Sequence, residues 1–218
     1  ALSPDFAPPY AALAAVFCNV HTNAWPAGHD EPLVRARQLA ERAVSLDDSL
    51  SQAHWVLGLA LMWSRQHDIA ARELERAIEL DPSFAHAYAA LGCLCSYDHR
   101  PEDAYRSLEM AMRLHPHYPD IFLHFLGLAY FVEGRYEAAA DTFARRVARR
   151  PGTDISRVLL ASAYGHIGRD DDARSQWDES LRVNPAYSLE HKRTALPFRH
   201  EADFERIVEG LRLAGIVE

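Results

Sequence analysis

The chain has 218 residues, of which 49% are hydrophobic and 25% are charged, and its formal net charge is −8. Such a composition is typical of a chain that folds around a packed core. Its acidity argues against direct binding of nucleic acid, whose phosphates require a basic surface. No apolar run reaches the ~20 residues that a membrane-spanning helix needs, so we expect no membrane span in this chain. We also expect the chain to be cytoplasmic.

The first fifty residues predict one irregular helical pair. Residues 1–6 look like the tail of a truncated preceding repeat, because Pro4 stands two residues before a phenylalanine as Pro82 does later. We therefore expect the chain to begin inside a longer solenoid or a longer polypeptide. Residues 7–50 then predict two helices separated by a long loop that contains the sequence NAWPAGHDEP, whose prolines and glycine favour irregular backbone.

A period of 34 or 35 residues governs the middle of the chain. Prolines recur at Pro82, Pro116, Pro151 and Pro185. Small residues recur in the same register at Gly58, Gly92, Gly127 and Ala161. Sixteen residues after each of these stands a large apolar residue, at Leu74, Leu108, Phe143 and Trp177. Glycine inside a helix costs roughly 1 kcal/mol relative to alanine, so its recurrence indicates a second helix packed closely against the first.

This register resembles that of the tetratricopeptide repeat (TPR), a helix–turn–helix unit of about 34 residues. The resemblance implies an all-α superhelix, or solenoid, formed as one continuous domain. Four regular repeats are expected at residues 51–84, 85–118, 119–153 and 154–187. The final segment, 188–218, lacks the repeat pattern. Its apolar stripe predicts a C-terminal capping helix that shields the last repeat, with Phe204, Ile207, Val208 and Leu211 on the buried face.

The resemblance also implies that the first helix of each repeat lines the inner surface. The inward columns provide ten candidate residues for a partner-binding groove: Gln52, Trp55, Leu59, Met62, Trp63, His86, Tyr97, His124, Leu128 and Phe131. These columns contain no lysine, arginine or asparagine, which argues against a carboxylate clamp for acidic chaperone tails. We expect instead a protein or peptide with an apolar or aromatic segment. Coverage by another part of the protein, self-association and small-molecule binding remain alternatives.

Motifs for catalysis are missing from the sequence. It has no glycine-rich phosphate loop, no GxSxG elbow and no HExxH helix. His115, His117 and Asp120 lie close together but do not form the paired four-ligand set of a structural zinc site. We expect neither enzyme activity nor a metal or cofactor in this chain. Three cysteines without CxxC spacing, Cys18, Cys93 and Cys95, predict buried free thiols.

Three longer stretches carry a second resemblance. They are ERAVSLDDSLSQAHWVLG, HPHYPDIFLHFLGLAYFVEGRYEAAADTF and the tail from Asn184 onward. Together they look like the TPR region that follows the catalytic domain in bacterial class III adenylate or guanylate cyclase-type proteins. The resemblance implies a regulatory or docking arm, with no catalytic residue of its own. Similar arms follow winged-helix domains in transcription regulators, and a free-standing scaffold is a third alternative.

Overall fold

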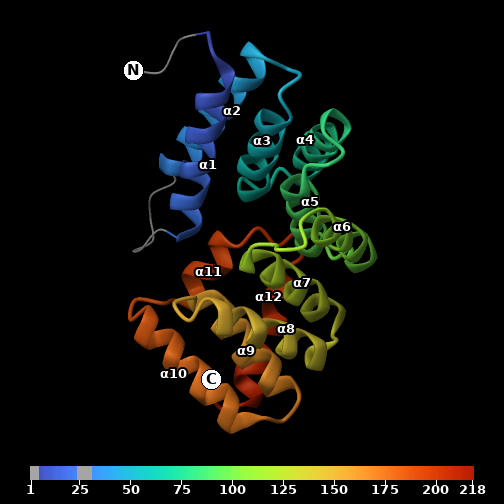
Figure 1. Cartoon of the computed structure of the whole chain (residues 1–218). Coiled ribbons are helices and arrows are strands. Elements are labelled where there is room, and N and C mark those ends of the chain that lie inside the picture. Colours follow the sequence, from blue (N-terminus) through green and yellow to red (C-terminus); the bar gives the residue numbers. More distant parts are fainter. Residues whose placement is uncertain (1–4, 24–30) are drawn as a thin grey trace.

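The computed structural model describes residues 5–23 and 31–218, and within these residues the chain forms helices and no strands (Figure 1). The helices are α1 Ala7–Asn23, α2 Glu31–Leu46, α3 Ser51–Trp63, α4 His67–Leu80, α5 Ala85–Tyr97, α6 Pro101–Leu114, α7 Asp120–Glu133, α8 Tyr136–Arg149, α9 Asp154–His166, α10 Asp170–Val183, α11 Leu189–Ala195 and α12 Glu201–Leu213. Most of the predicted N-terminal tail and of the loop after α1 falls at residues 1–4 and 24–30, outside the described residues.

The helices up to α10 form consecutive antiparallel pairs, α1–α2 through α9–α10, and adjacent pairs stack on one another. The second helix of a pair is amphipathic: in α4 the buried residues are His67, Ala70, Leu74 and Ala77, which share one helical face. The first helix is enclosed on several sides, and nine of the 13 residues of α3 are buried. None of the described helices is long and apolar enough to cross a membrane.

The recurring glycines lie where the two helices of a pair approach most closely. A Cβ atom added to Gly58 would lie 2.6 Å from Cγ of Leu74, and one added to Gly127 would lie 2.6 Å from Cε1 of Phe143. Real Cβ atoms essentially never make contacts this short, so the pairs that contain Gly58, Gly92 and Gly127 need a residue without a side chain opposite the large apolar residue. The predicted small–large interlock is therefore present in the packing.

The turn inside each regular pair contains one residue with left-handed backbone. These residues are Arg65 (φ 58°), His99 (φ 58°), Gly134 (φ 85°) and Gly168 (φ 72°). They recur with the repeat period, since each lies in the turn between the two helices of a pair. Glycine adopts this conformation without steric cost, whereas Arg65 and His99 adopt it at a steric cost from their Cβ atoms. The first two turns therefore hold a side chain at a position where backbone geometry favours glycine.

The C-terminal segment does not continue the stack of pairs. Figure 1 shows α11 and α12 inside the curve formed by the other helices, and α12 packs against α9. The predicted apolar stripe of α12 is buried, with exposed fractions of at most 8%. Glycine also allows this contact, because a Cβ added to Gly165 would lie 1.8 Å from the main-chain oxygen of Gly210. The two helices therefore cross with their backbones in direct contact.

Candidate peptide-binding surface

The ten candidate groove residues differ in exposure. Five are buried, with exposed fractions of 5% or less: Met62, Tyr97, His124, Leu128 and Phe131. Four are half-buried: Trp55, Leu59, Trp63 and His86. Gln52 is exposed. The half-buried residues all come from α3 and α5, so the accessible part of the predicted groove lies toward the N-terminal end of the solenoid.

One group of candidates forms an aromatic row across three pairs. The ring of Trp63 lies 6.0 Å from that of His21 and 6.1 Å from that of Tyr97. Tyr97 in turn contacts Phe198, between α11 and α12, at 4.9 Å. The C-terminal segment therefore covers Tyr97, and burial raises the pKa of its hydroxyl well above the usual value. Trp63 marks the point where this row becomes partly accessible.

A second group lies apart from that row. The ring of Trp55 contacts Phe84 at 5.4 Å and His86 at 5.9 Å, and His86 also contacts Phe122. Burial lowers the pKa of His86, and the positive charge of nearby His115 lowers it further. His86 is therefore an uncharged neighbour for Trp55 near neutral pH.

His124 belongs to a buried polar network between helices. Its Nδ1 atom lies 2.9 Å from Oγ of Ser156, which accepts a hydrogen bond of 2.5 Å from Arg146. Arg146 also pairs with Asp120 at 3.3 Å. Burial and the charge of Arg146 hold the pKa of His124 well below its ordinary value, so the imidazole is neutral at pH 7. These contacts join α7, α8 and α9 and do not provide an accessible site.

Arg65 binds the end of α11 from the turn between α3 and α4. Its guanidinium donates hydrogen bonds to main-chain oxygens of Arg193 (3.2 Å), Thr194 (3.1 Å), Leu196 (2.7 Å) and Phe198 (2.8 Å). The last carbonyls of a helix have no partner inside it, and a cation near them is stabilising. Since α11 has no buried residue of its own, this contact is central to its placement.

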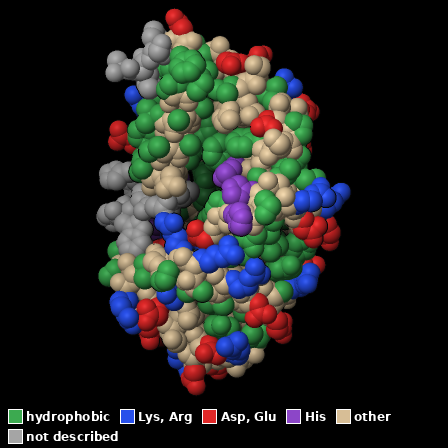
Figure 2. Space-filling model, viewed as in Figure 1, with side chains coloured by type: hydrophobic (Ala, Val, Ile, Leu, Met, Phe, Trp, Pro, Cys, Tyr) green, Lys and Arg blue, Asp and Glu red, His purple; other side chains and the backbone are tan. Residues whose placement is uncertain are grey.

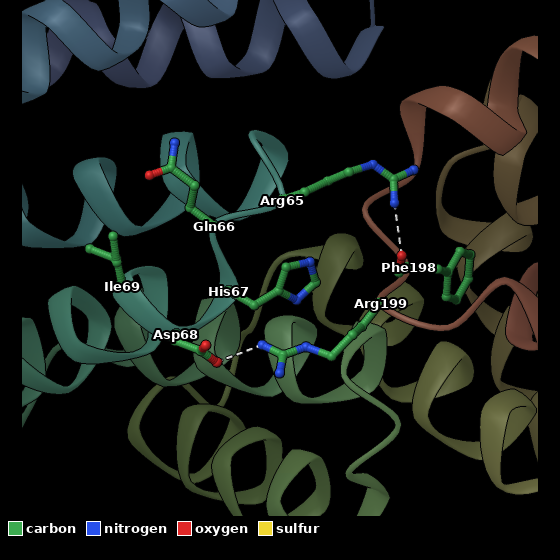
Figure 3. A pocket seen from close by; sticks show the side chains of 7 residues that line it. All are labelled: Arg65, Gln66, His67, Asp68, Ile69, Phe198 and Arg199. Carbon is green, nitrogen blue, oxygen red and sulfur yellow. Dashed lines mark hydrogen bonds and ion pairs between the residues drawn. The ribbon is translucent and has the colours of Figure 1, made fainter.

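Arg199 holds the next part of the segment. Its guanidinium pairs with Asp68 at 2.6 Å and with Asp98 at 3.0 Å, while its main-chain N–H donates to the carbonyl of Tyr97. Asp98 also forms a short hydrogen bond with Nδ1 of buried His67. An open cleft of about 530 Å³ is lined by Arg65, His67 and Arg199, and Figure 3 shows Arg65 extending toward Phe198 and Arg199 toward Asp68.

The second, third and fourth regular repeats bind α12. His99 pairs with Asp203 at 2.9 Å, and Arg206 donates a hydrogen bond to the carbonyl of Val132. In α9, Oγ of Ser162 donates to the carbonyl of Ile207 at 2.9 Å, and Nε2 of His166 donates to that of Arg206 at 2.8 Å. Side chains of the first and fourth regular repeats, Arg65, Ser162 and His166, thus bind the backbone of the C-terminal segment.

Sequence reasoning did not single out Arg65 or His99 as contact residues, although a signal was present. Both occupy the turn column in which Gly134 and Gly168 stand in the later repeats. A non-glycine residue at a left-handed position has a local cost, so its presence suggests a compensating contact. Within residues 5–23 and 31–218, no group of three or more potential metal ligands was found.

The space-filling view shows that the concave side is only partly filled. In Figure 2 a hollow with hydrophobic walls is visible, bordered by histidine and by basic side chains. The row from Trp63 to Phe198 joins the accessible part to the part that the C-terminal segment covers. The surface is therefore one continuous strip, occupied at one end by the chain itself.

Comparison with known proteins supports the fold. No protein-family model matches the chain. Among solved structures it is similar to the pilus biogenesis factor PilW (TM-score 0.66, 16% identity, 93% of this chain and 89% of that chain). It is also similar to TTC0263, a thermophilic TPR protein of Thermus thermophilus (0.64, 19%, 91% and 99%). A third is YrrB, described as a TPR protein with an unusual peptide-binding site (0.54, 20%, 84% and 89%).

A curated protein matches a shorter stretch. The putative adenylate cyclase 3 of Rhizobium meliloti (strain 1021) is 48% identical over 44 residues, which are 20% of this chain and 8% of that protein. The chain thus spans a small part of that relative. The structural similarities extend over most of the chain, and two of these three structures are described as TPR proteins. The predicted all-α architecture is confirmed: the chain has the fold of a tetratricopeptide-repeat solenoid.

Proposed function

We propose that this chain is a protein-interaction module whose concave surface binds an apolar or aromatic peptide segment. The observation that carries the proposal is the C-terminal segment itself, held by hydrogen bonds from Arg65, Ser162 and His166 to its main chain. Main-chain recognition combined with aromatic contacts is a common way to bind a peptide. The half-buried Trp63 continues this surface, because its ring contacts Tyr97, which contacts Phe198. Trp55 and Leu59 lie on the same helix, α3.

We further propose that the module is the regulatory arm of a larger bacterial cytoplasmic signalling protein with an adenylate or guanylate cyclase domain. The 44-residue similarity to a putative adenylate cyclase supports this assignment. The buried free cysteines are also compatible with a reducing compartment. In this proposal the solenoid docks or senses a partner, and the attached domain forms the cyclic nucleotide.

Selection from a library of random 15-residue peptides tests the binding function. The full chain is the bait, and selected peptides are measured against wild type and Trp63→Ala. We expect aromatic-rich peptides whose affinity falls about 30-fold in the variant, which corresponds to ~2 kcal/mol for a hot-spot residue. Trp177→Ala is the matched control, because Trp177 is also half-buried but lies on α10. Selected peptides that bind wild type and Trp63→Ala with equal affinity would contradict the proposed binding surface.

The regulatory assignment has its own test. The coding sequence upstream of Ala1 is determined first, and a class III cyclase domain is expected there. Cyclic-nucleotide formation by the natural polypeptide is then compared with that of its Trp63→Ala and Trp177→Ala variants. We expect the first substitution to change the rate and the second to leave it unchanged. An upstream region without a cyclase domain would refute this part of the proposal.

A further inference from the structure

The seam between the C-terminal segment and the repeats is more polar than the cores of the helical pairs. Three charged side chains of the segment reach the repeats: Arg199, Asp203 and Arg206. They are met by polar groups that include Asp68, Asp98 and His99. By contrast, the buried face of α6 is made only of alanine and leucine. Polar contacts of this kind can exchange with water or with another peptide more readily than an apolar core.

Hydrogen bonding in this seam is incomplete. Among the described residues three buried side-chain polar atoms have no hydrogen-bond partner, and two of them lie here: Nε2 of His67 and Oδ2 of Asp203. Both residues are nearly inaccessible, with exposed fractions of 4% and 2%. A buried polar atom without a partner has lost its hydration without compensation, so it destabilises the docked arrangement. The segment is thus docked on a surface that does not satisfy all of its polar groups.

The crossing of α9 and α12 restricts what this surface can hold. The backbone contact between Gly165 and Gly210 leaves no room for a side chain on either helix. Next to it, Ile207 and Leu211 are buried, with exposed fractions of 1% and 0%. A ligand helix therefore needs glycine at the crossing and apolar residues beside it. An acidic residue in the first turn of the ligand helix can pair with His99, as Asp203 does in this chain.

We propose that residues 189–213 are an exchangeable resident ligand of the concave surface, and that an outside protein segment of the same chemistry replaces them. That partner segment has a short helix, an extended link with an aromatic residue and an arginine, and a second helix with the acid and glycine described above. The inference rests on the proposed peptide-binding function and deepens it, because it names the class of partner. Until the partner binds, the segment keeps this half of the surface closed.

The test uses the full chain and a fluorescently labelled synthetic peptide of residues 187–218 as the probe. The resident segment is weakened by Arg199→Ala with Asp203→Asn, which leaves the groove itself unchanged. We expect the peptide to bind this variant at least 10-fold more tightly than wild type, because apparent affinity scales with the fraction of open groove. Arg212→Ala is the matched control, since the hydrogen bonds of this residue stay within the C-terminal tail. It should bind the peptide as wild type does.

A peptide with Gly210→Leu should lose at least 10-fold in affinity for the weakened chain. Equal binding to wild type and variant, or equal binding of the two peptides, would overturn the proposal. Circular dichroism checks folding, and the single variant Arg199→Ala, at a partly exposed residue, provides a second chain if the double variant unfolds. Light scattering that shows an exchanged dimer would overturn the outside partner in favour of a second copy.

The two proposals can fail separately. Peptide selection depends on Trp63 in the accessible part of the strip, whereas the exchange experiment depends on the covered part near Gly165. If the labelled peptide exchanges but no selected peptide depends on Trp63, the proposed function of the accessible part is refuted. The exchange proposal is then still supported. Selection of such peptides without exchange would show instead that the segment is a fixed part of the fold.

Discussion

Gly165 lies in the tightest of the helix contacts made by glycine in the described residues. In an ordinary helix interior, replacing glycine by alanine stabilises by roughly 1 kcal/mol. Here the new methyl group would lie 1.8 Å from a main-chain oxygen of α12, which cannot move aside as a side chain can. We expect Gly165→Ala to lower the free energy of unfolding by ~2 kcal/mol or more, as overpacking does. Urea denaturation measures the change.

Gly152 gives the control for that substitution. A Cβ added there meets no atom within 4 Å, and its φ is not left-handed. We expect Gly152→Ala to change the free energy of unfolding by less than about 0.5 kcal/mol. If both alanine variants were equally stable, the close crossing of α9 and α12 would be wrong.

His124 makes stability depend on pH in a defined direction. Its pKa in the folded chain is far below normal, while in the unfolded chain it is near 6.5. Below about pH 6.5 the unfolded state therefore binds a proton that the folded state does not. Stability should fall as pH falls through this range, with a slope of up to ~1.4 kcal/mol per pH unit from this one residue. Above pH 7 this contribution is constant.

His124→Asn tests the assignment, because asparagine is neutral and can still bond to Ser156. We expect the variant to lose less stability than wild type between pH 7 and pH 5.5 in urea titrations. A smaller effect of the same sign is expected at His86, whose pKa burial also lowers. If His124 were protonated in the folded chain, the stability of wild type and that of His124→Asn would fall in parallel as pH falls.

At the scale of the helix, the repeat register predicts where packing is strong. Val16 in α1 and Leu94 in α5 occupy equivalent columns, but Val16 is 56% exposed and Leu94 only 1%. We expect Leu94→Ala to cost about 2–5 kcal/mol because it opens a cavity, and Val16→Ala to cost less than about 0.5 kcal/mol. Urea denaturation of both variants checks the pair. A large loss at Val16 would show that the outer face of α1 is packed.

The same register explains how much of this structure the sequence could predict. Helical pairs, their order and contacts such as Gly58 against Leu74 follow from a period that relates residues 16 apart. The placement of the C-terminal segment follows no period, since Arg65 and Phe198 are 133 residues apart. The repeat register therefore predicts that the inner columns form a groove, whereas Phe198 and α12 cover part of them in the structure. Trp63, whose ring contacts His21 and Tyr97, is only half-buried.

At the scale of the molecule, the C-terminal segment connects repeats that are not neighbours in the solenoid. Repeats in such a fold contact mainly their neighbours, so stability is usually local and the ends open first. Here Arg65, in the first regular pair, bonds to residues that lead into α12, and α12 packs against the last pair. The first and last regular pairs are thus coupled through the segment as well as through the stack.

This coupling predicts an unusual response to Arg65→Gly. Glycine relaxes the left-handed backbone at this turn, where φ is 58°, so a purely local effect would stabilise the chain. We expect the opposite, because four main-chain oxygens of residues 193–198 lose their donor. Hydrogen exchange should become faster in α11 and in the turn between α3 and α4, while α7 and α8 keep their protection. Arg100→Ala, which removes only a pair with Asp103 on its own turn, is the control. Unchanged exchange in α11 of the glycine variant would mean that the segment is held by α12 alone.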